Sequence, residues 1–165
     1  MRTHDYDELA PVVQELSEAI VWCSMTTVGP DQHPRARVVH PVWDWASRPL
    51  RGWVTSRPTP LKRAHLAGNP GVTCAYFSPT THDLVMFDCD AAWAPAAELE
   101  RRWHDTAAVP PPMGFDPATI WPEGPGSHDF AVIDLRPHRI TVQTGAALAR
   151  GEKAMQWRAS GSAAA

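Results

Sequence analysis

The feature that most constrains this chain is a series of short extended runs, rich in β-branched residues and bounded by turn residues. These runs lie at 21–28, 34–43, 51–55, 72–78, 83–93, 129–135 and 138–144. They do not alternate one for one with helices, so a parallel βαβ arrangement is not expected. The first two runs flank Gly29-Pro30-Asp31, which is typical of a hairpin turn. We therefore predict a mainly β fold of about six or seven mostly antiparallel strands, closed into a barrel because closure removes the sheet edges.

Helices are expected at the periphery of this sheet. Residues 5–20 place apolar side chains at helical spacing. A second helix is predicted over 59–68, ahead of the breakers at 68–70, and a third over 95–105 with proline in its first turn. Six prolines make 108–127 a loop, and a loop of this length is usually functional or disordered.

The 165 residues fit one domain, which we expect to span residues 1–150. The Ala-, Gly- and Ser-rich residues 151–165 are predicted to form a disordered tail. Cys23, Cys74 and Cys89 are widely spaced and form no C-x-x-C pair, so we interpret them as small buried residues.

Charge and hydropathy exclude two classes of partner. A formal net charge of −3 gives no basic face for nucleic acid. No apolar stretch of roughly 18 residues is present, and acidic residues follow the N-terminal methionine, so neither a membrane span nor a signal peptide is expected. A cytoplasmic location is expected by default.

Cations and hydroxyl groups gather on two stretches. Alternate residues of a strand share a face, so Arg35 and Arg37 should point the same way. The start of the second helix adds further groups, namely Thr55, Ser56, Thr59, Lys62 and Arg63. Helix N-termini attract anions, arginine binds phosphate oxygens in bidentate fashion, and lysine adds a point charge. If the fold brings the two stretches together, they form a phosphate pocket.

The same residues fit a second interpretation. Arg35 and Arg37 can lie on a solvated strand edge, and Lys62 and Arg63 on an exposed helix surface. No P-loop pattern is present to decide between the two.

Other chemistry has weaker support. The histidines show no H-x-x-x-H or H-E-x-x-H spacing, so no metal site is predicted. Asp88 and Asp90 share a strand face as an acid/base pair does, although a solvated face is the favoured interpretation. Phe115 and Trp121 in the proline-rich loop are either core residues or a cap for a planar ring.

Three stretches resemble the core of the pyridoxamine 5′-phosphate oxidase family. They are residues 34–43 (PRARVVHPVW), 52–56 (GWVTS) and 61–72 (LKRAHLAGNPGV), within a likeness that covers roughly residues 10–145. The resemblance implies an FMN-binding split β-barrel, a homodimer with the cofactor at the subunit interface, and hydride or electron transfer to a small planar molecule.

The resemblance also implies roles for individual residues. Arg37 matches the strand arginine that contacts the flavin phosphate, and the backbone of Val38, Val39 and His40 matches the segment that lines the isoalloxazine ring. Thr55, Ser56 and Lys62 match the groups of the phosphate region, and Thr59 stands near the position of a family serine.

One departure bears on the substrate and the cofactor. The C-terminal segment that closes the substrate site in true pyridoxamine phosphate oxidases is not visible, and residues 135–140 (LRPHRI) are only faintly similar to the end of that barrel. Vitamin B6 oxidation is therefore not expected. Besides FMN, the 8-hydroxy-5-deazaflavin coenzyme, heme and an empty pocket remain alternatives, and the chain is either an oxidoreductase or a non-catalytic binding protein.

Overall fold

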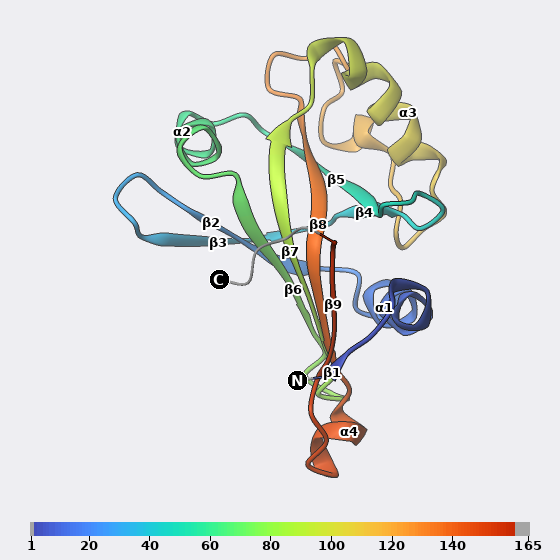
Figure 1. The fold of residues 1–165 in the computed structure, drawn as a ribbon. Coiled ribbons are helices and arrows are strands. Elements are labelled where there is room, and N and C mark those ends of the chain that lie inside the picture. Colours follow the sequence, from blue (N-terminus) through green and yellow to red (C-terminus); the bar gives the residue numbers. More distant parts are fainter. Residues whose placement is uncertain (1, 161–165) are drawn as a thin grey trace.

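A curled and largely antiparallel sheet organises the molecule, as Figure 1 shows for the computed structural model, which describes residues 2–160. The strands are β1 (Arg2–Thr3), β2 (Cys23–Val28), β3 (Pro34–Val39), β4 (Val42–Asp44), β5 (Arg51–Ser56), β6 (Gly71–Phe77), β7 (Leu84–Trp93), β8 (Ala131–Gln143) and β9 (Met155–Arg158). The helices are α1 (Tyr6–Ile20), α2 (Pro60–Gly68), α3 (Leu99–Ala108) and α4 (Gly145–Ala149), with short 3₁₀ helices at Ala96–Glu98 and Pro117–Thr119.

The long strand β8 divides the sheet. On one side it pairs with β7 along almost its whole length, and on the other it pairs first with β5 and then with β9. The hydrogen-bonded order is β1-β9-β8-β7-β6-β2-β3, while β4 joins through β5, and β1 with β9 is a parallel pair in an otherwise antiparallel sheet. This division of one curled sheet confirms the predicted split-barrel class.

The division into strands differs from the sequence prediction at two places. The runs at 129–135 and 138–144 form the single strand β8, because Pro137 lies at a β-bulge where the ladder is already interrupted. The run at 34–43 is instead two strands, β3 and β4, separated at His40 and Pro41. Proline cannot donate to a ladder, so the chain turns there and leaves His40 between the strands.

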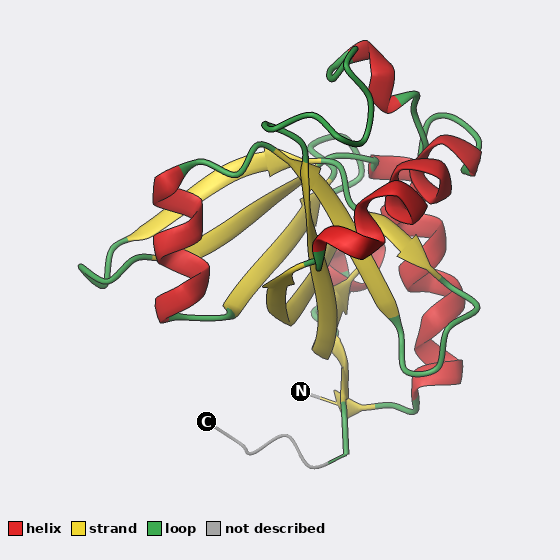
Figure 2. Cartoon of the chain, turned by 90° about the horizontal axis from the view of Figure 1, so that it is seen from above, coloured by secondary structure: helices red, strands yellow, loops and turns green. Residues whose placement is uncertain are grey.

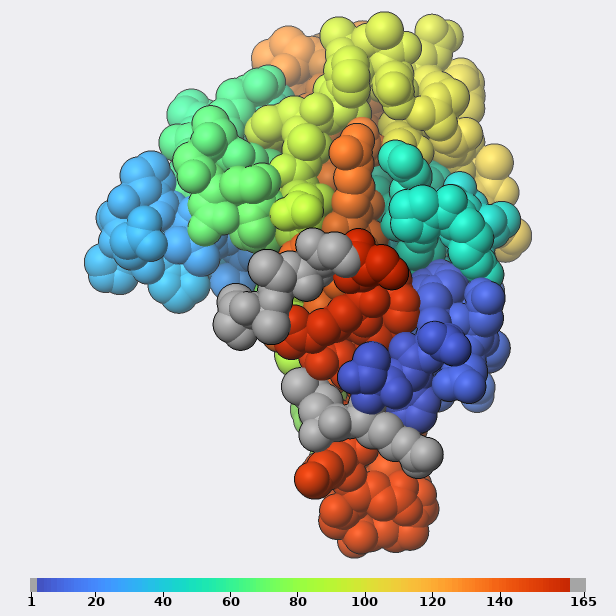
Figure 3. All heavy atoms as spheres, viewed as in Figure 1, coloured from blue at the N-terminus to red at the C-terminus, as the bar shows by residue number. Residues whose placement is uncertain are grey.

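The predicted disordered tail contains a strand. Residues Met155–Arg158 pair antiparallel with β8, and Gln156 is buried in that pairing, so sheet contacts order a segment whose composition indicated disorder. Residues 161–165 of the predicted tail lie outside the described residues. The connection between β8 and β9, which carries α4, projects as a knob from the body of the molecule (Figure 3).

Two apolar clusters hold the fold together. The larger one fills the inside of the sheet under α1, and it includes Cys23, Cys74 and Cys89 as buried free thiols, as predicted. The second lies beneath α3 and the proline-rich loop, and consists of Val42, Trp53, Trp103, Trp121, Phe130 and Val132. Figure 2 shows the helices flanking the sheet. No helix in the described part of the chain combines the length and apolar character needed to cross a bilayer.

The proline-rich loop is packed rather than loose. The indole N–H of Trp53 on β5 donates to Thr106 Oγ1 on α3 at 2.9 Å. The indole N–H of Trp121 donates to the Asp129 carbonyl at 3.0 Å. The first bond anchors α3 on the sheet, and the second ties the loop to the residues just before β8, so the loop has a fixed position from which its side chains can build a site.

Of the two described strand glycines Gly52 and Gly71, Gly52 leaves less room for a side chain. A Cβ there would lie 2.3 Å from Trp43 Cε3, and Trp43 is itself stacked on Phe87 with its ring centroid 4.2 Å away. We expect Gly52→Ala to lower the free energy of unfolding by about 1–3 kcal/mol, the usual cost of overpacking. Urea unfolding followed by circular dichroism measures this, with Gly126→Ala as control because a Cβ at Gly126 meets nothing within 4 Å. Equal stability of the two variants would contradict the prediction.

Candidate functional site

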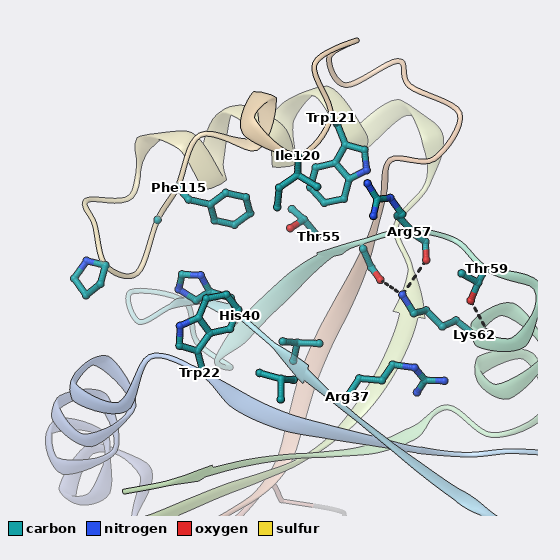
Figure 4. Close-up of a pocket in the computed structure, with 15 residues that line it drawn as sticks. Trp22, Arg37, His40, Thr55, Arg57, Thr59, Lys62, Phe115, Ile120 and Trp121 are labelled. Atoms are coloured by element: carbon teal, nitrogen blue, oxygen red, sulfur yellow. Dashed lines mark hydrogen bonds between the residues drawn. The ribbon is translucent and has the colours of Figure 1, made fainter.

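A cavity of about 660 Å³ opens between β3, the end of β5, the start of α2 and the proline-rich loop (Figure 4). Its lining residues are Trp22, Arg37, Val38, Val39, His40, Thr55, Ser56, Arg57, Thr59, Lys62, Pro112, Gly114, Phe115, Ile120 and Trp121. Arg37, Arg57 and Lys62 lie at one end of the cavity and Trp22, His40 and Phe115 at the other, while Trp121 lies beside Arg57 (Figure 4). The cavity is therefore chemically polarised along most of its length.

Arg37 and Lys62 form the cationic end without any counter-ion. Arg37 Nη1 donates to Thr27 Oγ1 at 2.9 Å and to the Arg35 carbonyl at 3.3 Å. Lys62 Nζ donates to Ser56 Oγ at 2.8 Å and to the Arg57 carbonyl at 3.1 Å. All four acceptors are neutral oxygens, and among residues 2–160 neither cation forms an ion pair with a carboxylate.

The two charges destabilise each other and are partly desolvated. Burial lowers the pKa of Arg37, and the charge of Arg35 lowers it further. Burial is also the main cause that lowers the pKa of Lys62, followed by the charges of Arg37 and Arg57. Uncompensated like charges in a cavity are the electrostatic signature of an anion site, because a bound anion removes both penalties.

The start of α2 adds to the positive end. Thr59 is the N-cap, and its hydroxyl oxygen accepts from the Lys62 backbone N–H at 3.4 Å, while Pro60 occupies the first turn. The positive end of the helix dipole therefore lies beside Lys62. Thr59, Pro60 and Lys62 are neighbours in the sequence, which explains why the sequence alone predicts this part of the site.

Arg57 is a third cation at the cavity, and it is already paired. Its Nε donates to Asp129 Oδ2 at 2.9 Å, and Ser127 Oγ donates to the other carboxylate oxygen at 2.9 Å. The same Asp129 accepts the Trp121 indole through its backbone carbonyl. Arg57 therefore ties the proline-rich loop to the cationic end rather than adding a free charge.

His40 lies at the centre of the aromatic end. Its ring centroid is 4.9 Å from that of Trp22 and 5.8 Å from that of Phe115, with the Phe115 ring nearly parallel. Burial lowers the pKa of His40, and a hydrogen bond with the Pro112 backbone opposes this shift. Its Nε2 atom is buried and has no hydrogen-bond partner within residues 2–160. A neutral imidazole thus lines the cavity with one ring nitrogen unpaired.

A strained turn holds Trp22 at this wall. Val21 has φ 70° and ψ −62°, and the Trp22 N–H donates to the Ile20 carbonyl at 2.8 Å, which is the geometry of a γ-turn. A β-branched residue rarely adopts positive φ, and such strain costs about 1–3 kcal/mol. It leaves the Trp22 side chain 57% exposed at the mouth of the cavity instead of inside the core.

The structure brings most of the predicted site residues together. Eight of them line the cavity, namely Arg37, Val38, Val39, His40, Thr55, Ser56, Thr59 and Lys62. Arg35 and Arg63 do not, and this corrects the expectation of a wider cationic cluster. Arg35 turns back to Asp31 at 3.4 Å, and the Arg63 guanidinium lies over the Trp93 ring at 5.2 Å. In both cases a nearer partner removes the side chain from the cavity.

Other lining residues were not recognisable from sequence. Trp22 reaches the cavity because of the turn at Val21, and Ile120 because the proline-rich loop packs over the sheet. Phe115 and Trp121 also line the cavity, in agreement with the alternative that aromatic side chains of the loop face a ligand pocket. Asp88 lies elsewhere, where it accepts from Thr73 Oγ1 at 2.7 Å and pairs with Arg139, so it takes no part in this site.

Comparisons with known proteins place the fold. No protein-family model matches the chain, and no curated protein sequence matches it either. Among solved structures, a Clostridium acetobutylicum protein related to general stress protein 26, of the pyridoxinephosphate oxidase family, superposes with a TM-score of 0.71 at 12% identity over 92% of this chain and 95% of that one. A pyridoxamine 5′-phosphate oxidase-related, FMN binding protein from Nostoc punctiforme gives 0.60 at 12% identity over 92% and 87%.

A heme binding protein from Mycobacterium smegmatis has the same fold. Its TM-score is 0.61 at 16% identity, and the match covers 86% of this chain and 60% of that one. At identities this low the similarity shows the fold alone. The chain therefore has the split-barrel fold of the pyridoxamine 5′-phosphate oxidase and FMN-binding proteins, a fold on which a heme binding protein is also built.

The environment of His40 predicts how stability depends on pH. Its pKa in the folded chain lies below the ordinary value of 6.5, so on acidification the unfolded chain takes up this proton first and stability falls. We expect wild type to lose more free energy of unfolding than His40→Phe between about pH 7.5 and about pH 5.5. Urea titrations at the two pH values measure the difference. The same loss in both proteins would show that His40 is not the group responsible.

Proposed function

We propose that the chain is a member of the pyridoxamine 5′-phosphate oxidase family that binds FMN and transfers hydride or electrons to a small planar molecule. The observation that supports this most strongly is the convergence of Arg37 and Lys62 on one cavity without a counter-ion. A phosphate group matches their charge and hydrogen-bonding capacity. The aromatic end, at the other side of the same cavity, matches a flat ring system.

The chemistry would come from the cofactor, and the chain supplies binding and orientation. Bound flavin provides hydride or electron transfer. Arg37, Lys62 and Ser56 hold the phosphate end, and the wall of Trp22 and Phe115 orients the ring and excludes water. No described residue that lines the cavity carries a carboxylate, so among the lining groups the neutral His40 is the natural partner for a proton or a hydrogen bond.

Two other ligands use parts of the same site. The 8-hydroxy-5-deazaflavin coenzyme shares the planar ring and the phosphate, so the cationic end serves it equally. Non-catalytic heme binding has one observation in its favour, which is the buried, unpartnered Nε2 of the neutral His40, since imidazole is a common axial ligand of heme iron. FMN is preferred to heme because the cavity concentrates its uncompensated positive charge at one end, where a single phosphate group fits.

Ligand titration separates these candidates. Purified chain is titrated with FMN, riboflavin, the deazaflavin coenzyme and heme, and thermal unfolding and visible absorbance are recorded for each. Ligand at 100 times its dissociation constant stabilises the folded state by about 2.7 kcal/mol, which is readily seen. A flavin spectrum that bleaches with a reductant and recovers with an added acceptor supports an oxidoreductase. Colour without turnover supports a carrier, and no shift with any ligand would overturn the proposal.

The phosphate end predicts a matched set of variants. Arg37→Ala and Lys62→Ala should each weaken FMN binding by about 1.5–3 kcal/mol, the size of a charge-assisted hydrogen bond. Arg35→Ala and Arg63→Ala are the controls, because they remove the same kind of charge nearby but outside the cavity. Fluorescence titration of FMN measures all four. Equal losses in the controls would mean that only the general positive potential matters.

We also propose that a second copy of the chain covers the outer face of the sheet. On this face Val38, Ser24, Ala75 and Met86 lie directly opposite one another across β3, β2, β6 and β7. On the core side, α1 packs against β6 and β7 and α2 packs against β2, whereas Val38 on the outer face is 73% exposed. Small and apolar side chains on such a face suit a self-complementary interface. Val38 also lines the cavity, so the partner would approach the ligand.

A cytoplasmic location stays a prediction.

Mass measurement in solution tests the interface. We expect wild type to elute as a dimer in size-exclusion chromatography with light scattering, and Ala75→Arg to elute as a monomer because a charge is then buried at the interface. Ala67→Arg on the exposed side of α2 is the control and should stay dimeric. A monomeric wild type, or a dimeric Ala75→Arg, would contradict this placement of the partner.

A further inference from the structure

A buried hydrogen-bond chain leads from Arg37 into the core. Thr27 on β2 accepts from Arg37 Nη1 at 2.9 Å, and the same Oγ1 lies 2.9 Å from Nδ1 of His65 on α2. Thr27 is 2% exposed and His65 is 1% exposed, and neither lines the cavity. These two hydrogen bonds thus connect three elements, β3, β2 and α2, behind the wall of the proposed phosphate end.

The proton positions in these hydrogen bonds follow from the guanidinium of Arg37. A guanidinium can only donate, so Thr27 Oγ1 is the acceptor toward Arg37. The hydroxyl proton of Thr27 then needs an acceptor of its own, and within residues 2–160 the one in reach is His65 Nδ1. We therefore assign the neutral tautomer of His65 with its proton on Nε2.

The His65 ring is fixed from its other side by the turn between β2 and β3. A Cβ on Gly29 would lie 2.8 Å from His65 Nε2 and 3.2 Å from Cε1, so the ring packs directly against the backbone of that turn. His65 also follows Lys62 by one turn of α2. One helix therefore places Lys62 in the cavity and, through His65 and Thr27, fixes the position of Arg37.

Arg37 needs such a support because its surroundings repel it. Burial and the charge of Arg35 lower the pKa of Arg37, and the charge of Arg37 in turn contributes to the lowered pKa of Lys62. A carboxylate in place of Thr27 would hold the guanidinium but would also neutralise it. A buried neutral hydroxyl, itself oriented by an imidazole, holds the guanidinium and leaves its charge available to an incoming anion.

We propose that Thr27 and His65 are positioning residues that preorganise Arg37 for the phosphoryl group of the ligand. This inference rests on the proposed function, because it assumes that the cationic end binds phosphate. Neither residue touches the ligand. Their contribution should therefore be selective for the phosphorylated ligand, which a general role in stability would not produce.

Paired titrations with FMN and riboflavin test the selectivity. Thr27→Val keeps the shape of the side chain and removes its hydroxyl, and we expect it to weaken FMN binding by about threefold to tenfold, as for one hydrogen bond, with riboflavin binding unchanged. Thr27→Ser should restore FMN binding, and His65→Phe should show a smaller loss than Thr27→Val. The control is Thr80→Val, which makes the same change in the exposed turn between β6 and β7, away from the cavity.

A second measurement needs no ligand. In the free protein, the guanidinium NMR signals of Arg37 should be resolved in wild type and in Thr27→Ser, and averaged by rotation in Thr27→Val. Wild type that prefers FMN to riboflavin, with Thr27→Val retaining that preference, would overturn the positioning role and leave the proposed function intact. Wild type with no preference for FMN would overturn the proposed function, and the Arg37 signals would then still decide whether Thr27 fixes this side chain. Equal losses of FMN and riboflavin binding in Thr27→Val would mark a structural effect and also overturn the inference.

Discussion

The pairing of β5 with the first half of β8 is the constraint on which the site depends. Gly52–Ser56 run antiparallel to Ala131–Leu135, so the end of β5 is fixed where the chain enters α2. That ladder also places Trp53 and Val132 in the second apolar cluster, where α3 and the proline-rich loop pack. Because β8 then turns to β9 for its remaining length, the sheet opens at this point instead of closing fully. The cavity lies at the other end of this ladder, where Thr55 and Ser56 pair with Val132 and Ala131 and the chain continues into α2.

Electrostatics at the cavity work against folding and in favour of binding. Keeping Arg37 and Lys62 close, partly buried and without a carboxylate costs stability that the rest of the fold must supply. Arg57 shows the alternative, since Asp129 neutralises it and the pair serves to hold the loop. One site thus contains a cation that is neutralised by a carboxylate, Arg57, and two that are not, Arg37 and Lys62. Only the charges of the latter two are available to a ligand. Preorganised donors of this kind bind an anion without reorganising when it arrives.

Sequence patterns predicted the parts of this molecule that local physical chemistry determines. The strand runs, the N-cap at Thr59 and the lysine beside it depend on neighbours in the chain, and all of these were recognisable. Arg35 and Arg63 were assigned to the site because their spacing is favourable, but spacing does not reveal competing partners such as Asp31 and the Trp93 ring. The strand β9 was missed because its order comes from an exposed edge of β8 rather than from its own composition. At Arg63 and at β9 a tertiary contact outweighed a local preference, whereas Arg35 is paired with a carboxylate only four residues away.

The proline-rich loop shows how such a site can be rigid without regular structure. Proline restricts the unfolded chain, so ordering this segment costs less entropy than ordering a flexible loop of equal length. Trp121 then fixes it through the Asp129 carbonyl, and Asp129 in turn holds Arg57. Phe115 is thereby held against His40, whose other face meets Trp22 from the strained turn after α1. The aromatic wall is therefore formed before any ligand enters, and a ring that fits it does not have to organise the loop. A wall built in this way selects by shape, since a ligand that demands a different spacing must disturb the anchored loop and the strained turn together.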